Sequence, residues 1–228
     1  MDAGCGTGRL TGELLNLLPH GKVVAVDLSE NMLRDAREHL APEFGNRVSF
    51  VAADLQYLPF DTVFGGIFST AAFHWVLDHR LLFTNLYHSL RPGGWLCAQC
   101  GGGPNLARLR ERVETLFGTA EFAPFFANFS EPWIYNDADT AAQIMSSMGF
   151  VNVETSLESV LTVLEDRAKY SDFVRSVILR EHLRRIPDLS LSAEFVEALT
   201  QQAASDDPPF SLDYWRLNLR GNRPHGNR

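Results

Sequence analysis

The chain has 228 residues, of which 45% are hydrophobic and 21% charged, a composition typical of one soluble domain with a sizeable core. Its net charge of −8 argues against a nucleic-acid partner, which needs clustered Lys and Arg, and no apolar run is long enough to span a membrane. Three cysteines and the lack of a visible signal peptide favour a reducing, cytoplasmic setting without a disulfide framework.

The first half of the sequence alternates short apolar runs with amphipathic segments. The expected strands, in chain order, are 1–3, 22–27, 48–52, 63–70 and 95–100, and the expected helices between them are 8–18, 29–40 and 79–90. Strands that alternate with helices favour right-handed βαβ units and a parallel sheet covered on both faces. We therefore expect an α/β fold with a doubly wound, mostly parallel sheet.

The second half is less regular. We expect helices at 105–117, 137–148, 166–186 and 192–204, a strand at 150–155 and another at 209–219, with a Phe- and Pro-rich lid or insertion at 120–133. This pattern predicts one domain over residues 1–228. Within it, 1–103 form a cofactor-binding half, 104–205 a helical cap and substrate-side segment interrupted by one strand, and 206–221 a final edge strand.

Three glycines at alternate positions follow the first short strand, at Gly4, Gly6 and Gly8. Glycine allows positive φ and lets backbone approach a ligand closely. The next helix begins near Gly8, so its free N–H groups and positive dipole end face the loop. The spacing G-x-G-x-G differs from the G-x-G-x-x-G of dinucleotide sites, because Arg9 stands where that pattern has glycine. The loop alone is compatible with a ligand site or with a tight turn.

Two acids strengthen the ligand interpretation. Asp27 ends the second expected strand and Asp54 follows the third, so both lie at the edge where open α/β sheets bind ligands. An acid after the second strand can accept both hydroxyls of a ribose, and one after the third can accept from the exocyclic amine of adenine. Taken singly, Asp27 also fits a helix-capping role and Asp54 a turn.

The motif series of the chain resembles that of class I S-adenosylmethionine-dependent methyltransferases. The resemblance rests on residues 2–8 (DAGCGTG), 26–33 (VDLSENML), 53–60 (ADLQYLPF) and 90–94 (LRPGG). Residues 69–79 (STAAFHWVLDH) are similar to the branch of trans-aconitate and malonyl-carrier-protein methyltransferases. The resemblance covers residues 2 to about 100.

The resemblance implies a seven-stranded sheet with the last strand antiparallel, and S-adenosylmethionine as cofactor. The implied cofactor-binding residues are Asp2, Gly4, Cys5, Gly6, Asp27, Leu28, Met32, Asp54, Leu55 and Ala71. Asp2 would lie near the amino group, the glycine loop along the methionine part, and Asp27 at the ribose. Leu28 and Met32 would flank the adenine, whose edge Asp54 and Leu55 would contact, and Ala71 would approach the sulfonium.

The implied reaction moves a methyl group to a small-molecule acceptor, with a carboxylate oxygen as the expected atom, and involves no metal. His74 is the candidate catalytic residue, able to bind an acidic substrate or take a proton. Trp75 and Trp133 are candidate substrate contacts. The alternative is that His74 and Trp75 only pack the pocket wall. Monomer and dimer are equally compatible with the sequence.

Two other functions are compatible with parts of the pattern. The first strand is reduced to residues 1–3, whereas a central strand has about five or six residues. A truncated, catalytically weak or inactive methyltransferase-fold binding protein is therefore the alternative, with weak cofactor binding or a gene start further upstream. A nicotinamide-dependent reductase is disfavoured by Arg9 and by the absence of an evident Tyr/Lys or His/Asp catalytic pair.

Three further motifs are interpreted as structural. The D-P-P-F of residues 207–210 resembles a motif of amino-methyltransferases, but it precedes the last strand and predicts a turn. Cys97 and Cys100 form a C-x-x-C inside a strand, where residues three apart face opposite sides, so we expect core cysteines. Arg108, Arg110 and Arg112 predict a solvated helix face rather than a substrate-binding cluster.

Overall fold

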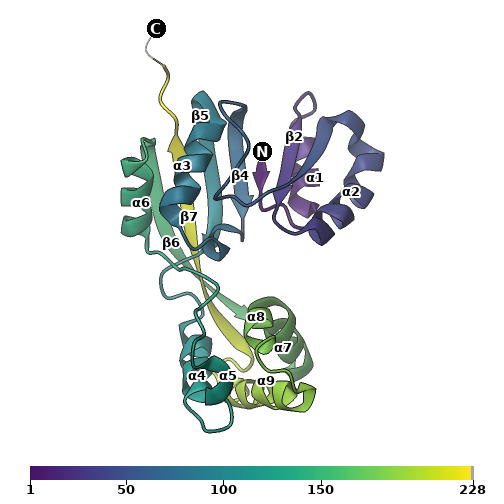
Figure 1. Ribbon diagram of the computed structural model, residues 1–228, viewed down its shortest axis with the longest axis vertical. Helices are drawn as coiled ribbons and strands as arrows, with labels where there is room; N and C mark the ends of the chain where they lie inside the picture. The colour runs from purple at the N-terminus through teal and green to yellow at the C-terminus, as the bar shows by residue number, and fades with distance from the viewer. Residues whose placement is uncertain (227–228) are drawn as a thin grey trace. The chain divides into compact units, whose positions relative to one another are not determined.

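A seven-stranded sheet organises the computed structural model, which describes residues 1–226 (Figure 1). The strands are β1 (Asp2–Ala3), β2 (Val23–Asp27), β3 (Val48–Ala52), β4 (Phe64–Thr70), β5 (Leu90–Gly101), β6 (Val151–Val163) and β7 (Ser211–Asn222), in the spatial order β3-β2-β1-β4-β5-β7-β6. The first five pair in parallel, and β7 runs antiparallel to β5. The predicted fold class is therefore confirmed.

The helices of this sheet divide between its two faces. They are α1 (Arg9–Leu17), α2 (Glu30–Phe44), α3 (His79–Ser89) and α6 (Ala138–Ser147). Within β2, Val23 and Ala25 pack in clusters with side chains of α1 and α2, whereas Val24 and Val26 pack in the cluster that holds α3 and α6. Because successive strand residues point to opposite faces, α1 and α2 cover one face and α3 and α6 the other.

The chain forms two compact units. Of the described residues, the first holds 1–103, 133–158 and 216–226, and the second holds 104–132 and 159–215. The helices of the second unit are α4 (Ala107–Phe117), α5 (Ala123–Phe126), α7 (Arg167–Phe173), a π-helical segment (Val174–Ile178), α8 (Arg180–Leu183) and α9 (Leu189–Ala203). Aromatic rings of Phe122, Phe126 and Phe195 are buried against one another in its core.

The prediction of an edge strand at 206–221 is wrong. β7 lies between β5 and β6, so β6 forms this edge of the sheet. Alternation of polar and apolar residues over 209–219 fits either position, because an inner antiparallel strand with one face toward solvent has the same period as an edge strand. The buried Leu217 and Leu219 of β7 pack in the main core, as an inner position requires.

Several element boundaries also differ from the predicted ones. Helix α2 runs through Pro42 to Phe44, because Leu40 and Phe44 are buried in one cluster against β2 and β3, and this packing outweighs the helix-breaking tendency of proline. Strand β6 extends to Val163 rather than ending at residue 155. The segment predicted as one helix over 166–186 is divided into α7, the π-helical segment and α8.

Candidate functional site

The glycine loop turns sharply between β1 and α1. Gly4, Gly6 and Gly8 have φ of 81°, 55° and 84°, in the left-handed region that glycine adopts at low cost. The backbone N–H groups of Gly4 and Cys5 both donate to the carbonyl oxygen of Val26 on β2, at 2.8 and 2.9 Å. No side chain caps the N-terminus of α1, so its first N–H groups face the loop without a side-chain acceptor.

The space beside the loop differs between Gly4 and Gly6. An ideal Cβ built on Gly4 would lie 2.2 Å from the Cβ of Ala72, so the loop there packs directly on the segment after β4. An ideal Cβ on Gly6 would meet no atom within 4 Å. The space on the Cβ side of Gly6 is therefore open to a ligand, while the Cβ side of Gly4 is occupied by Ala72.

Asp27 joins this loop to the end of β2. Its Oδ2 accepts from the backbone N–H of Gly6 and its Oδ1 from that of Ser29, both at 2.8 Å. A carboxylate has about four lone-pair positions, so each oxygen keeps capacity for a further donor. The carboxylate thus fixes the loop and can still receive the two hydroxyls of a diol.

Asp2 lies beneath the loop. Only 2% of its surface is exposed, and its Oδ2 accepts from the Thr11 hydroxyl at 2.6 Å. Burial raises the pKa of Asp2 above its ordinary value. Burial also raises the pKa of Cys5 to about 12, so this thiol stays protonated and unreactive at neutral pH.

The remaining predicted contacts follow the ends of β2 and β3. Asp54 accepts from the backbone N–H of Gln56 at 2.8 Å, which forms a turn after β3. Leu55 is buried beside it. Leu28 is 73% exposed and Met32 is half-buried on α2, so both offer apolar surface next to Asp27. Strands β2 and β3 pair in parallel in register, which puts Asp27 opposite Ala52 and brings these residues to one sheet edge.

The segment after β4 completes this edge. Ala71 is exposed and has φ of 55°, and Ala72 packs against Gly4 as described above. The Ser69 hydroxyl donates to the carbonyl oxygen of Ala3 at 2.6 Å, a contact that ties the ends of β4 and β1 together. Ser69 was not among the predicted residues, because a buried serine in an apolar strand carries no sequence signal of its long-range partner.

His74 lies in a short 3-10 turn (Phe73–Trp75) after β4. Its Nδ1 accepts from the backbone N–H of Gly101, the last residue of β5, at 3.2 Å. Burial, with a smaller effect of His79, lowers the pKa of His74 to about 4. A second buried histidine, His79, donates from Nε2 to the carbonyl oxygen of Phe73 and accepts at Nδ1 from Asn136.

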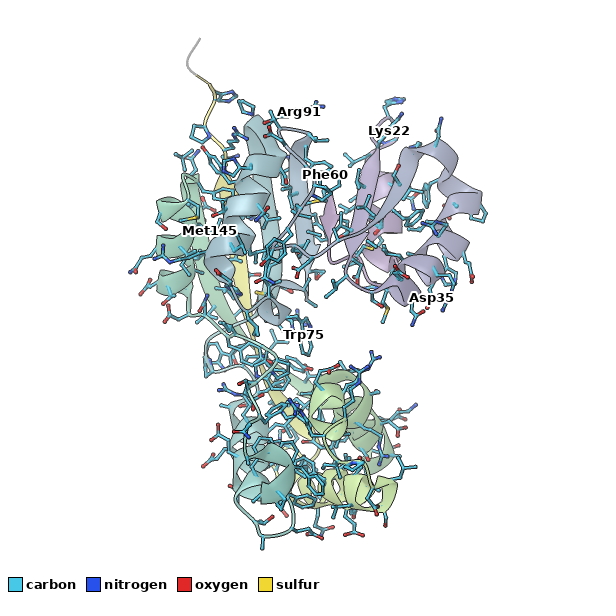
Figure 2. All side chains as sticks on the ribbon, in the orientation of Figure 1. Lys22, Asp35, Phe60, Trp75, Arg91 and Met145 are labelled. Atoms are coloured by element: carbon cyan, nitrogen blue, oxygen red, sulfur yellow. The ribbon has the colours of Figure 1, made fainter. Side chains whose placement is uncertain are left out.

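Aromatic rings surround His74 within the first unit. The ring centroids of His74 and Trp75 are 5.1 Å apart, those of His74 and Tyr135 5.8 Å, and those of Trp75 and Trp133 5.7 Å. Figure 2 labels Trp75, which is 41% exposed, at the end of the sheet where β4 finishes. Trp133 is 6% exposed. The structure therefore brings His74, Trp75 and Trp133 together, and adds Tyr135.

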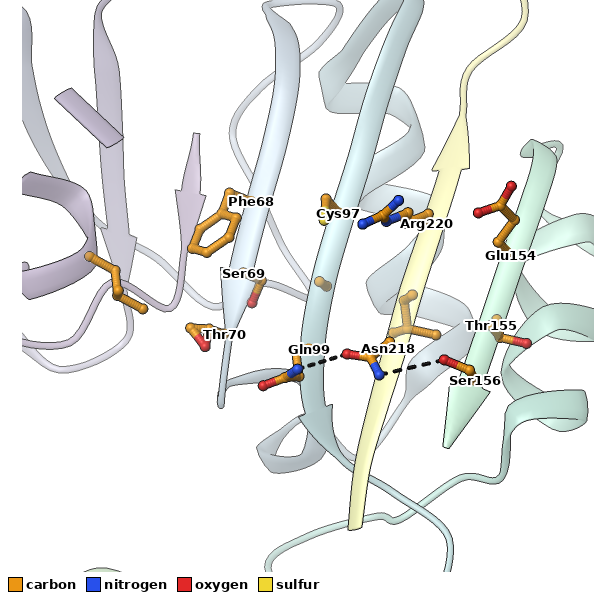
Figure 3. Close-up of a pocket in the computed structure, with 13 residues that line it drawn as sticks. Phe68, Ser69, Thr70, Cys97, Gln99, Glu154, Thr155, Ser156, Asn218 and Arg220 are labelled. Carbon is orange, nitrogen blue, oxygen red and sulfur yellow. Dashed lines mark hydrogen bonds between the residues drawn. The ribbon is translucent and has the colours of Figure 1, made fainter. Parts of the chain in front are cut away.

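A separate hollow of about 650 Å³ lies on the face of the sheet that α1 and α2 cover (Figure 3). Its lining residues are Leu10, Phe68, Ser69, Thr70, Cys97, Ala98, Gln99, Glu154, Thr155, Ser156, Asn218, Leu219 and Arg220. Gln99 donates to Asn218 at 2.7 Å and Asn218 donates to Ser156 at 3.5 Å, a polar ladder across β5, β7 and β6. Of the lining residues, Leu10 lies in the first turn of α1 after the glycine loop and Thr70 is the last residue of β4.

Other predicted features lie elsewhere. The solvated-face prediction is wrong for Arg108 and Arg112: in the second unit Arg112 binds Asp206 with both guanidinium nitrogens at 3.1 and 2.5 Å, and Arg108 lies 3.5 Å from the same carboxylate. These guanidiniums are thereby neutralised within their own unit. Residues 207–210 form the expected turn before β7.

The two cysteines of β5 lie on opposite faces, as expected. Cys100 is buried in the core, and burial raises its pKa to about 12. Cys97 lines the hollow and is only half-buried, so the expectation of a core residue is wrong for it. Among residues 1–226, no group of three or more His, Cys, Asp or Glu side chains is placed to hold a metal ion. The same part of the chain contains no helix with the length and apolarity of a membrane span.

Comparison with known proteins identifies the class of this chain. Residues 1–94 match the family described as methyltransferase domain. The chain is 30% identical over 218 residues to the trans-aconitate 2-methyltransferase of Afipia carboxidovorans, covering 91% of this chain and 78% of that protein. It is 29% identical over 131 residues to malonyl-acyl-carrier-protein O-methyltransferase 1 of Ilyobacter polytropus, covering 58% of this chain and 48% of the relative.

The fold is similar to that of a solved methyltransferase complex. The phosphoethanolamine N-methyltransferase 2 of Haemonchus contortus, with phosphomonomethylethanolamine and S-adenosylhomocysteine, aligns with a TM-score of 0.61 at 18% identity, over 98% of this chain and 48% of that one. The chain thus spans about half the length of several proteins that it matches. It belongs to the family of class I S-adenosylmethionine-dependent methyltransferases.

Proposed function

We propose that this protein transfers a methyl group from S-adenosylmethionine to a carboxylate oxygen of a small molecule. The observation that carries the proposal is the arrangement at Gly6 and Asp27. The space on the Cβ side of Gly6 is open, and the Asp27 carboxylate holds the loop while keeping acceptor capacity for a diol.

The residues at this edge fit the parts of the cofactor in turn. Asp27 accepts the ribose hydroxyls, and the apolar side chains of Leu28 and Met32 flank the adenine, whose edge meets Asp54 and Leu55. The backbone of Gly4, Cys5 and Gly6 lies along the methionine part, with Asp2 below it. S-adenosylmethionine carries no phosphate, so the absence of a lysine after the glycines fits as well.

The chemistry demands little beyond orientation. The bound cofactor supplies a methyl group on a sulfonium, which is a good leaving group. Ala71, exposed with a positive φ at the end of β4, borders the place where the methyl emerges and leaves room for an acceptor. Holding the acceptor in line with the methyl supplies most of the rate enhancement, because a bimolecular step becomes effectively unimolecular. His74 and Trp75 follow Ala71 closely in the chain, Trp133 packs beside Trp75, and these three residues form the acceptor side.

The carboxylate assignment draws on the relatives. The proteins at 29–30% identity are named for methylation of trans-aconitate and of malonyl-acyl-carrier protein. Both acceptors are carboxylic acids. A carboxylate is ionised at neutral pH and attacks without a general base, in keeping with the lowered pKa values of His74 and His79, which keep both rings neutral.

Calorimetric titration of the 228-residue chain with S-adenosylmethionine and with NADH tests cofactor class. We expect saturable binding of S-adenosylmethionine and none of NADH; the reverse would overturn the proposal. Transfer from cofactor with a tritiated methyl group is then measured on matched panels of acids, phenols and amines. Base-labile methyl esters are the expected products, and cofactor binding without any transfer would instead indicate a binding protein of methyltransferase fold.

A further inference from the structure

The hydrogen bond between Gly101 and His74 fixes the proton positions of the imidazole ring. A backbone N–H is always a donor, so Nδ1 must present its lone pair to it. A neutral imidazole has one N–H, and it therefore stands on Nε2. This tautomer follows from the geometry at β5, and cannot be read from the sequence because positions 74 and 101 are far apart in the chain.

The neighbours of His74 reinforce its neutral state. The titratable groups that act on it or pack against it in the first unit are His79 in α3, Cys100 on β5 and Tyr135, while Asp78 acts on His79. His79 is itself neutral, since Nε2 donates to Phe73 and Nδ1 accepts from Asn136. The Asp78 carboxylate caps α3 by accepting from Leu81. Protonation of His74 would place an Nδ1–H against the Gly101 N–H, and burial lowers its pKa to about 4.

The ring is oriented as well as neutral. The His74 carbonyl oxygen accepts from the backbone N–H of Ile134 at 2.8 Å, which holds the 3-10 turn to the segment carrying Trp133 and Tyr135. The aromatic rings of Trp75 and Tyr135 pack next to the imidazole, with ring centroids 5.1 and 5.8 Å from its own. Within residues 1–226 the side-chain hydrogen bond of His74 is made at Nδ1 and none is found at Nε2, which is not a fully buried atom, and the residue is half-buried. Its N–H is therefore a polar group whose direction the fold determines and which a ligand can still engage.

We propose that His74 binds the methyl acceptor as a fixed Nε2–H hydrogen-bond donor and never acts as a base, so that this site methylates only oxygens that are already ionised. The proposal rests on the methyltransferase function proposed above and defines its substrate class. One carboxylate oxygen accepts from Nε2–H while the other uses a lone pair to form the new O–C bond. The S–C bond breaks, its electron pair returns to sulfur, and no proton is transferred. Phenols and alcohols, which must lose a proton, are excluded.

The first test separates a donor from a base. His74→Gln retains an N–H donor but cannot act as a base, and His74→Phe retains a ring without a nitrogen. Losing a hydrogen bond to a charged acceptor lowers kcat/KM on the order of 10- to 100-fold, so we expect this loss in His74→Phe and a rescue to within about threefold in His74→Gln. Cofactor affinity should be unchanged in both. The wild-type profile of kcat/KM should show no ionisation of the enzyme between about pH 6 and pH 9.

The second test does not depend on turnover. In long-range ¹H–¹⁵N spectra of the ¹⁵N-histidine-labelled chain at pH 7, assigned with the His74→Gln variant, we expect His74 as the neutral Nε2–H tautomer. Addition of trans-aconitate should shift Nε2–H, whereas phenol should not. An imidazolium, an Nδ1–H tautomer, methylated phenol, or a His74→Gln variant as slow as His74→Phe would overturn the proposal. If the wild type binds S-adenosylmethionine and methylates nothing, the proposed function fails, while the spectra still decide the tautomer and the carboxylate contact.

Discussion

The backbone N–H of Gly6 donates to Oδ2 of Asp27 across 2.8 Å, and this bond links the glycine loop after β1 to the end of β2. The same carboxylate accepts from Ser29 at the start of α2. One side chain therefore organises two elements of the sheet edge in advance, and reduces the reorganisation that cofactor binding requires.

Replacement of Asp27 by Asn tests this double role. The amide oxygen can satisfy only one of the two N–H groups, so the amide nitrogen meets a donor and an orphaned N–H costs about 1–3 kcal/mol of stability. We also expect affinity for S-adenosylmethionine to fall at least about tenfold, since the ribose loses its charged acceptor. Asp35→Asn, on the surface of α2, is the control. Unchanged calorimetric affinity in Asp27→Asn would refute the ribose assignment.

Two glycine substitutions distinguish a structural position from a ligand-facing one. In Gly4→Ala the new Cβ would lie 2.2 Å from Ala72, at a φ of 81°, and we expect a loss of about 2–4 kcal/mol in the free energy of unfolding. In Gly6→Ala the Cβ enters open space, so only the φ penalty of about 1 kcal/mol remains.

The order of the two variants should be reversed for cofactor binding, because the variant that loses less stability should lose more affinity. Gly6→Ala is expected to remain folded and to lose cofactor affinity, because its methyl group occupies the space in which the cofactor contacts the loop backbone. Urea denaturation followed by calorimetry of the folded fraction measures both effects. Equal destabilisation of the two variants, or normal cofactor binding by Gly6→Ala, would show that the space at Gly6 is not a ligand position.

How far the sequence predicts this structure depends on the range of the interactions. The strand ends, the positive-φ glycines and the acids at 27 and 54 follow from local patterns, and the structure brings their segments to one edge of the sheet. Ser69, Gly101 and Tyr135 were not predicted, because each acts through a partner that is distant in sequence. The position of β7 within the sheet likewise depends on pairing with β5, about 120 residues away, and its alternating pattern does not specify a neighbour.

The buried carboxyl group of Asp2 is expected to lower the stability of the fold while it contributes to cofactor binding. Its folded pKa is raised by burial, so the proton binds more tightly in the folded chain than in the unfolded one. The stabilisation from the protonated group is complete below the unfolded pKa of about 4 and is lost as pH rises through the folded pKa. Above the folded pKa the ionised carboxylate therefore opposes folding.

The Asp2→Asn variant should remove this cost and keep an oxygen for the Thr11 hydroxyl. Its melting temperature is expected to exceed that of the wild type at pH 7, with the difference shrinking toward pH 4. Affinity for S-adenosylmethionine should fall if the carboxylate faces the amino group of the cofactor. Calorimetric melting across that pH range is decisive: a difference that grows toward acid pH would mean that burial does not raise the pKa of Asp2.

Arg223, in the polar segment after β7, stabilises the end of a helix, although its place in a polar segment gives no indication of this role. Its Nη1 donates to the carbonyl oxygens of Tyr87, His88 and Leu90, at 3.2, 3.2 and 2.6 Å, and so caps the C-terminus of α3. The guanidinium carbon also lies 4.9 Å from the centre of the Tyr87 ring. A cation at a helix C-terminus interacts favourably with the dipole, and carbonyls at the end of a helix need donors.

Arg223→Ala is therefore expected to lower the free energy of unfolding by about 1–2 kcal/mol, from the lost hydrogen bonds and the cation–π contact together. Arg220→Ala, an exposed arginine of β7 three residues earlier, is the control and should change stability by less than about 0.5 kcal/mol. Urea denaturation monitored by tryptophan fluorescence measures both. Because Arg223 binds the C-terminal end of α3, whereas the segment that contacts the glycine loop precedes α3, Arg223→Ala should leave cofactor affinity unchanged, and a parallel loss of affinity would mean that α3 and the loop are energetically coupled.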